Sequence, residues 1–114
     1  MTNCNNDKHI KAVELSKINS LSDDLLIELS NIYKAIGEVS RLKIIHALMQ
    51  SDLCVYHISE ITGQKQSLTS HQLSILKSNK IIKSRREGQM IIYSIADEHI
   101  KSIINMSLEH LGCL

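Results

Sequence analysis

The segment between residues 55 and 95 does most to limit how this chain of 114 residues can fold. Its first part, VYHISEITGQKQSLTSHQLSILKS, holds two stretches with apolar residues at helical spacing, separated by a turn at Gly63. Its second part, IIKSRREGQMIIYSI, holds two isoleucine-rich runs on either side of a turn that contains Gly88. The segment therefore predicts a helix-turn-helix followed by a β-hairpin, which together form a winged helix.

Helical patterns also precede and follow this segment. Ser22, with two aspartates after it, is typical of a helix start, and the apolar spacing continues to Gly37. Ser40 is expected to cap the next helix, and Asp97 to cap the last one. The predicted fold class is mainly α with a small β-hairpin, a winged helix-turn-helix.

Length and composition favour one small domain. At 43% apolar residues, the chain can bury a modest core. We expect residues 1–20 to form an N-terminal arm, and residues 21–114 to form a winged helix-turn-helix domain for DNA binding and dimerisation. The chain has no run of eighteen apolar residues, and its first residues lack the apolar core of a secretory signal. We therefore expect a cytoplasmic protein without a membrane span.

The cysteines suggest free thiols. Cys4, Cys54 and Cys113 are an odd number and do not form an intramolecular disulfide framework. In a reducing compartment such thiols are buried apolar groups, metal ligands or redox centres.

Positive charge is concentrated in the helix-turn-helix and the hairpin. Residues 61–86 hold six basic residues and no acidic one, whereas the rest of the chain holds seven basic and twelve acidic residues, a formal charge of −5. A local basic stripe on an otherwise acidic chain favours a polyanionic partner such as double-stranded DNA. A solvated basic face is the alternative, although such a face usually has acidic residues interleaved.

Several motifs in a fixed order resemble the ArsR/SmtB family of metal-responsive winged-helix repressors. They are VSRLKIIHAL, DLCVYHIS, QKQSLTSHQLSILKS, REGQMIIYSI and the DEHI and EHLGC ends of the last helix. The resemblance covers roughly residues 25–113. It implies a homodimer, joined through the terminal helices, that binds operator DNA without metal and is released when an inducer binds. Family members often have proline just before the Ser-Arg pair, where this chain has Glu38 and Val39.

The predicted recognition helix and the hairpin supply the candidate DNA contacts. Glutamine and histidine can hydrogen-bond base edges in the major groove, whereas serine, lysine and arginine suit phosphates. The resemblance points in particular to Gln66, Ser67, Ser70 and His71. The whole candidate set is Lys65, Gln66, Ser67, Ser70, His71, Gln72, Lys77, Arg85, Arg86 and Gln89.

The last helix carries metal-competent side chains at both ends. His99 and His110 share a face but lie roughly 16 Å apart along the axis, at ~1.5 Å per residue, so one helix cannot bring them to one ion. Two antiparallel copies can, because one register pairs His99 with His110 and Asp97 with Cys113. At a spacing of three residues, His110 and Cys113 are expected to share a helix face. The alternative is a capping aspartate, surface histidines and an incidental cysteine.

The resemblance bears on the metal as well. Asp97, His99 and His110 match the terminal-helix sensing motif of the family, whose fourth ligand is usually histidine or glutamate. Cys113 in that place makes the site softer. Zn(II) is the first expectation for a tetrahedral N/O/S set, and Co(II), Cd(II) or Pb(II) are the other candidates.

A second metal site is also predicted. DLCVYHI resembles the Cys-Val-Cys-Asp box of the family, with Cys54 at its first cysteine and His57 at its aspartate. Cys4 in the arm of a partner chain could complete such a site, as could Asp7 or His9. A buried cysteine and a surface histidine explain the pattern equally well.

These features predict a metal-sensing repressor of metal efflux or resistance genes. The alternatives are a thiol redox-responsive repressor that uses Cys54 and Cys113, or a small zinc-binding protein without a regulatory role. The sequence lacks HExxH, GxSxG and a phosphate-binding glycine loop, so we do not expect an enzyme.

Overall fold

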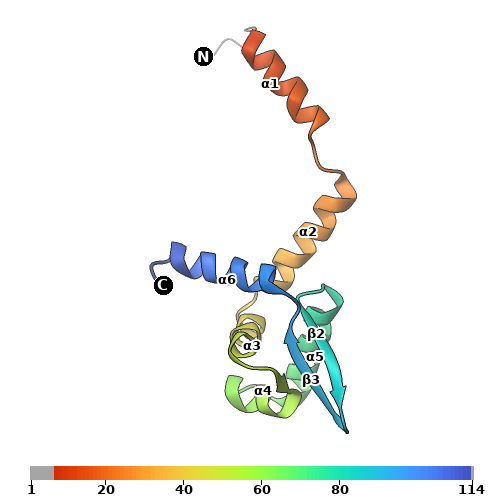
Figure 1. Ribbon diagram of the computed structural model, residues 1–114, viewed down its shortest axis with the longest axis vertical. Coiled ribbons are helices and arrows are strands. Elements are labelled where there is room, and N and C mark those ends of the chain that lie inside the picture. Colours follow the sequence, from red (N-terminus) through yellow and green to blue (C-terminus); the bar gives the residue numbers. More distant parts are fainter. Residues whose placement is uncertain (1–6, 114) are drawn as a thin grey trace. The chain divides into compact units, whose positions relative to one another are not determined.

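The computed structural model describes residues 7–113 (Figure 1). The elements are α1 (Asp7–Ile18), α2 (Asp23–Ile36), α3 (Val39–Gln50), β1 (Leu53–Cys54), α4 (Val55–Thr62), α5 (Gln66–Ser78), β2 (Ile82–Glu87), β3 (Met90–Ile95) and α6 (Glu98–His110). None of the helices within residues 7–113 is long and apolar enough to cross a membrane. The chain divides into two compact units, which meet between Ser30 and Asn31 inside α2.

The first unit holds α1 and the beginning of α2. Apolar side chains of α1, such as Ile10, Val13 and Leu15, are exposed. The backbone N–H of Leu25 donates to Ser22 Oγ at 3.2 Å, so Ser22 caps α2 as predicted. The predicted arm thus includes a helix, and the division into residues 1–20 and 21–114 stays a prediction.

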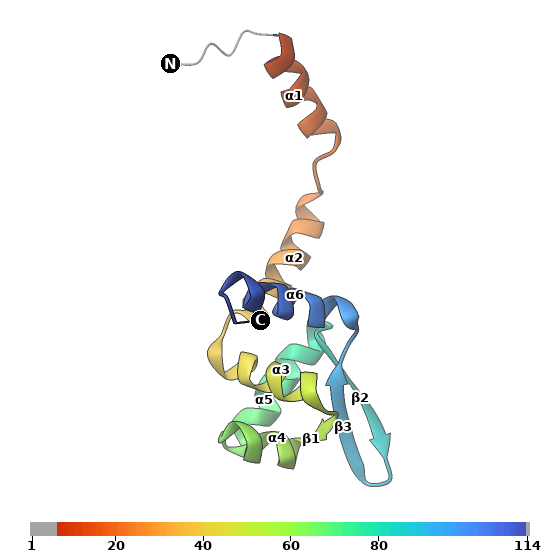
Figure 2. The same cartoon turned by 60° about the vertical axis from the view of Figure 1, so that its left-hand side comes forward.

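Isoleucine and leucine side chains build the core of the second unit. Ile44 and Ile45 of α3, Ile58 of α4, and Leu73 and Leu76 of α5 are at most 1% exposed. Burying one such side chain contributes roughly 1.5–3 kcal/mol. Figure 2 shows α3, α4 and α5 grouped beside the hairpin. The shared core therefore fixes how α5 is presented at the surface.

The strands form an antiparallel sheet in the order β1, β3, β2. The predicted hairpin is confirmed, since β2 and β3 pair from Ile82 opposite Ile95 to Glu87 opposite Met90. Gly88 in the turn has a φ of 62°, a left-handed conformation that glycine adopts without a steric penalty. The hairpin lies beside α5, which makes it the wing of a winged helix.

The sequence did not predict strand β1. Leu53 lies opposite Tyr93, and Cys54 opposite Ile92. A strand of two residues shows no alternating pattern that could have revealed it. Cys54 is therefore part of the sheet and directly precedes Val55, the first residue of α4.

The prediction that Ser40 caps α3 is wrong. The helix begins at Val39, and the cap is Glu38, whose carboxylate accepts the backbone N–H of Arg41 at 3.1 Å. Ser40 lies inside the helix and donates its hydroxyl to the same carboxylate. This hydroxyl, followed by backbone hydrogen bonds, holds the pKa of Glu38 below its ordinary value.

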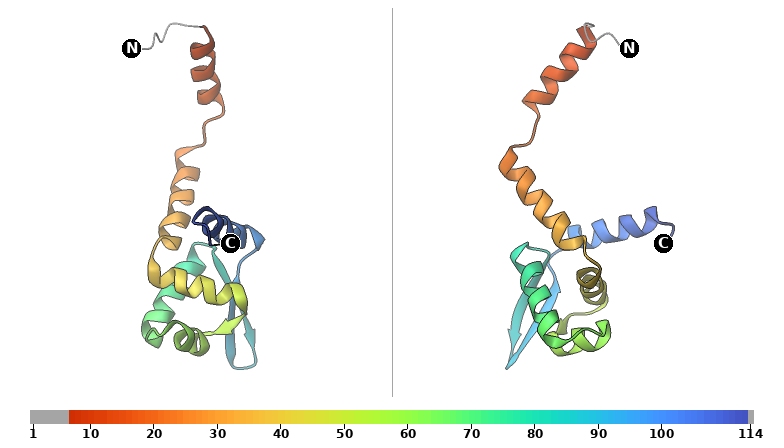
Figure 3. Two further views of the ribbon diagram at one scale, coloured as in Figure 1. Left: turned by 90° about the vertical axis from the view of Figure 1, so that its left-hand side faces the viewer. Right: turned by 180° about the vertical axis from the view of Figure 1, so that it is seen from behind.

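Helix α6 extends from the end of β3 away from the sheet (Figures 1 and 3). Asp97 caps it as predicted, because Oδ1 accepts the backbone N–H groups of His99 at 2.9 Å and Ile100 at 3.2 Å. The N–H of Ile100 is the main cause that lowers the pKa of Asp97. Ile100 and Ile104 anchor the helix in the core.

The other end of α6 closes with a reversal of the chain. Gly112 has a φ of 80° and donates its N–H to Glu109 O, while Cys113 donates its N–H to Leu108 O, both at 2.9 Å. This pair of bonds is a Schellman motif, which ends a helix. Cys113 therefore lies beyond α6, and our expectation that it shares a helix face with His110 is wrong.

Candidate DNA interface and metal-ligating side chains

Within the second unit, one face of α5 is buried and the opposite face is exposed to solvent. Thr69, Leu73 and Leu76 are at most 1% exposed and pack inward. On the opposite face lies a row of exposed polar side chains spaced three or four residues apart. This outer face of α5 consists of Ser67, Ser70, His71 and Ser74.

Ser74 on this face was missed in the sequence analysis. It follows His71 by three residues and Ser70 by four, so helical spacing alone could have found it. The flank of α5 adds Lys65, Gln66 and Lys77, all exposed. The structure thus brings most of the predicted DNA-contacting side chains onto one continuous surface.

Gln72 departs from this pattern. Its side chain is 7% exposed, and its amide is hydrogen-bonded to Arg41 and Ser40 of α3. A glutamine amide that is buried, with both its oxygen and its nitrogen bonded inside the chain, is not presented to a base edge. We therefore correct our assignment and leave Gln72 out of the DNA interface.

The two arginines of the wing differ in their partners, since Arg85 pairs with carboxylates and Arg86 with a backbone carbonyl. Arg85 donates from Nη1 to Asp52 at 2.8 Å and from Nε to Glu87 at 3.0 Å, and these bonds, the one to Asp52 first, raise its pKa above the ordinary value. Arg86 donates Nε to the carbonyl of Gly88 at 3.2 Å. Gln89, at the tip, is exposed. The charge of Arg85 is thus compensated inside the chain.

Lys77 connects the recognition helix to the wing. Its Nζ donates to Ser84 Oγ of β2 at 2.7 Å. Both side chains lie at the surface, where the ammonium keeps two further donors for a phosphate. Lys77 therefore holds the wing beside α5 and remains a candidate phosphate contact.

The predicted terminal metal ligands lie at the two ends of α6. Asp97 Oδ1 is 3.5 Å from His99 Nδ1, and the two side chains are 55% and 93% exposed. His110 and Cys113 at the other end are exposed as well. Within residues 7–113, the single chain assembles no group of three or more histidine, cysteine, aspartate or glutamate side chains that could hold a metal.

Cys54 and His57 form a close pair at the start of α4. Cys54 Sγ lies 3.5 Å from His57 Nδ1. The thiol is 6% exposed and borders a cleft of about 450 Å³ between α4, α5 and β3, whereas the imidazole is exposed. Cys4, the expected third ligand, lies outside the described residues. The structure thus brings two of the three predicted ligands together.

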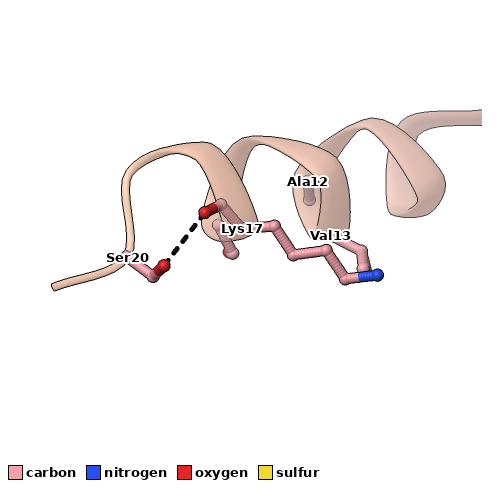
Figure 4. Close-up of a pocket in the computed structure, with 5 residues that line it drawn as sticks. Ala12, Val13, Lys17 and Ser20 are labelled. Carbon is pink, nitrogen blue, oxygen red and sulfur yellow. Dashed lines mark hydrogen bonds between the residues drawn. The ribbon is translucent and has the colours of Figure 1, made fainter. Parts of the chain in front are cut away.

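A hollow on α1 in the first unit has no donor set for a metal. It is lined by Ala12, Val13, Ser16, Lys17 and Ser20 (Figure 4). The hydrogen bond drawn there is local, from Ser20 Oγ to the carbonyl of Lys17 at 2.9 Å. This hollow is the surface of one helix and its following turn, so we assign it no ligand.

The packing of α3, α4 and α5 and the wing beside α5 define a winged helix-turn-helix, an architecture that presents its second helix to the DNA major groove. Comparison with known proteins places the chain within this class. The family of bacterial regulatory proteins called arsR matches residues 38–84. A transcriptional repressor SmtB homolog from Synechocystis is 31% identical over 90% of this chain and 78% of its own length. The chain therefore belongs to the ArsR family of DNA-binding regulators, which are not enzymes.

Two further proteins fit the same family. A cadmium resistance transcriptional regulatory protein CadC homolog from Staphylococcus aureus is 31% identical over 82% of both chains. A homodimeric winged helix-turn-helix DNA-binding domain from Mycobacterium bovis is 31% identical over 82% of this chain and 93% of its own, with a TM-score of 0.71. The predicted fold and family are thereby confirmed.

Proposed function

We propose that the chain is a metal-sensing transcriptional repressor that binds operator DNA as a homodimer and is released when Zn(II) or a related ion binds. The main observation in favour of metal sensing is the arrangement of ligand side chains on α6. Two exposed metal-competent side chains lie at each end of this helix, too far apart to meet within one chain. The name of the CadC homolog, a cadmium resistance regulatory protein, supports a metal as the effector.

An antiparallel pair of α6 helices would unite the two ends. Met106 is 66% exposed, and it follows His99 by seven residues and precedes His110 by four. At ~100° per residue these three side chains lie within roughly 40° of one another around the helix. A second, antiparallel copy of α6 on this face would cover Met106 and bring His99 of one copy opposite His110 of the other. The dimer would then hold two equivalent sites.

The side chains present fit such a site. Asp97 caps α6 through Oδ1, and a carboxylate has a second oxygen that can ligate. With His99 of one copy and His110 and Cys113 of the other, the donors are one oxygen, two nitrogens and one sulfur, which suits tetrahedral Zn(II). The thiolate would also favour Cd(II) or Pb(II) over harder ions, and Co(II) accepts the same geometry.

The outer face of α5 would read the major groove. Ser67, Ser70, His71 and Ser74 present hydrogen-bonding groups toward base edges, while Lys65, Gln66 and Lys77 flank them. Arg86 and Gln89 of the wing would reach the backbone or the adjacent minor groove. Two copies would present two such helices to successive major grooves of one operator.

Metal and DNA would compete through the arrangement of the dimer. Asp97 and His99 of one copy and His110 of the other would hold the ion, which would crosslink the two α6 helices and so favour one dimer arrangement over others. If that arrangement changes the spacing of the two α5 helices, a coupling of about 1–3 kcal/mol lowers DNA affinity by roughly 5–150-fold.

The pair Cys54 and His57 favours a second candidate function. With Cys4 of a second copy it would form another metal site, and with Cys113 it would make the chain responsive to oxidants.

The test is a titration of DNA binding. Reduced, chelator-treated protein is added to a labelled duplex from upstream of its own gene while fluorescence anisotropy is followed, and Zn(II) is then added. Binding followed by release at stoichiometric zinc supports the proposal. Binding that no metal reverses but an oxidant does would move the assignment to redox control, and absence of binding would refute the repressor.

A further inference from the structure

Arg41 of α3 connects the end of α2 with the recognition helix. Its guanidinium donates Nε to the carbonyl of Ala35 at 2.6 Å and Nη2 to the carbonyl of Lys34 at 3.2 Å. From the same plane, Nη1 donates to Gln72 Oε1 of α5 at 3.0 Å. One side chain thus holds three elements of the second unit.

The two carbonyls are groups that the helix itself leaves without partners. Helix α2 ends at Ile36, and the last four carbonyls of a helix have no intrahelical donor. A cation at this end is also favoured by the helix dipole. Because a guanidinium is planar and its donors point in fixed directions, binding these carbonyls also fixes where Nη1 points.

The other half of the Gln72 amide is held too. Gln72 Nε2 donates to Ser40 Oγ at 2.8 Å, and Ser40 donates to the carboxylate of Glu38. That carboxylate accepts the backbone N–H of Arg41 at 3.1 Å, which closes a ring of hydrogen bonds around the N-terminus of α3. Both ends of the buried amide therefore have a defined partner.

Polar anchors of α5 are few. Among residues 7–113, the hydrogen bonds that join α5 side chains to other elements are those of Gln72 with α3 and of Lys77 with β2. The remaining inward side chains, such as Leu73 and Leu76, make apolar contacts, which are not directional. Among the described residues, Gln72 is thus the only buried side chain of α5 that is hydrogen-bonded to another element.

We infer that Gln72 is a positioning residue for DNA recognition: held by Arg41 and Ser40, it sets the rotation and position of α5 so that the outer face meets base edges. Gln72 acts through Arg41 and does not touch DNA. The inference needs the chain to bind DNA sequence-specifically, and it does not depend on the metal.

The test uses a double-mutant cycle on specificity. A preferred duplex is first selected by the wild-type protein from a random pool. Kd is then measured at one salt concentration for this duplex and for a shuffled one. The specificity ratio, which is the Kd of the shuffled duplex divided by that of the preferred duplex, is compared among wild type, Gln72→Met, Arg41→Lys and the double variant. Gln50→Met, the same change at an exposed glutamine of α3, is the matched control. Melting temperatures are recorded for all.

We expect each single variant to lower the ratio by about tenfold, the scale of one mismatched base pair. The specificity ratio of the double variant should be no lower than that of either single variant, because the two substitutions remove the same connection. Binding to the shuffled duplex should change little, since phosphate contacts supply it. Gln50→Met should leave the ratio unchanged.

Two outcomes would overturn the inference. An unchanged ratio with a lower melting temperature would make Gln72 purely structural, and multiplied losses in the double variant would mean that Gln72 acts on DNA independently of Arg41. If Gln72→Met does not fold, Gln72→Glu keeps the acceptor for Arg41 and should retain most of the ratio, whereas Arg41→Lys should not. A pool without any enriched sequence would refute both the proposed function and the inference.

Discussion

The outer face of α5 and the ends of α6 differ in how much of a site one chain can make. On α5, Ser67, His71 and Ser74 lie in one row, and the fold of a single chain completes the surface. On α6, Asp97 and His99 are separated from His110 by the length of the helix, so one chain can supply only the two halves of the proposed metal site.

This difference predicts which of the two proposed functions depends on dimer formation. A surface built from one helix face needs only the core that supports it, so each copy can contact DNA. A metal site split between helix ends requires a second copy, so metal binding would report the dimer arrangement directly. The dimer is therefore the step at which the two functions can be connected.

Breaking the dimer should have the largest effect, because it would separate the two halves of the proposed metal site and also the two α5 faces that would bind one operator together. Met106→Asp places a charge on the face between His99 and His110. Each copy would lose roughly 1.5–3 kcal/mol of apolar burial. We expect the dimer dissociation constant, measured by analytical ultracentrifugation, to rise by at least about tenfold. Glu109→Asp, at another exposed position of α6, is the control. A variant that stays dimeric at the wild-type concentration would place the dimer interface elsewhere.

Removing one ligand should separate the two functions. His99→Ala is expected to bind the operator with wild-type affinity and to lose the metal-driven release, a change of about 5–150-fold in affinity. His46→Ala removes an exposed histidine of α3 and should respond to metal normally. Anisotropy titrations with and without Zn(II) measure both properties. Loss of DNA binding in His99→Ala without metal would contradict the separation.

The sequence predicted the elements that have local signals. The hairpin follows from its glycine turn, and the α6 cap follows from Asp97 before a helical pattern. The errors come from contacts between distant residues or from chain reversals. Ser40 is a good cap by residue type, but the helix begins earlier, and Glu38 caps it by accepting the backbone N–H of Arg41. Gln72 looks like a surface residue until Arg41, far away in the sequence, is placed beside it.

The candidate sites show the same limit. Helical spacing could have identified Ser74, since it repeats the positions of Ser67 and His71. Spacing also misled, because counting three residues from His110 put Cys113 on a helix that ends before it. Whether Cys113 reaches the site therefore depends on the chain reversal at Gly112, which helical periodicity does not describe.

The two wing arginines provide a test of the proposed DNA contacts, with a smaller expected effect on binding. Arg86→Gln should weaken binding to all duplexes and reduce the slope of log K against log salt by about 1, as expected for one lost phosphate contact. Arg85→Gln should leave that slope unchanged, because Asp52 and Glu87 already neutralise its guanidinium. Anisotropy over a salt series measures both slopes. Equal changes in the two variants would show that Arg85 leaves its carboxylates to bind DNA.

The smallest expected effect is a dependence of stability on pH at the support of α5. Hydrogen bonds from Ser40 and from the backbone hold the pKa of Glu38 below its ordinary value of 4.5. A lowered pKa in the folded state adds stability that is fully present above pH 4.5 and is lost as the pH falls through the lowered pKa. Glu38→Gln should therefore melt at a lower temperature than wild type at pH 7, and the difference should shrink toward zero as the pH falls well below 4.5, as followed by circular dichroism. A difference that persists at acid pH would mean that the shape of the side chain, and not its charge, supports the start of α3. If instead the difference shrinks, the ring of hydrogen bonds behind the recognition helix is sensitive to acid.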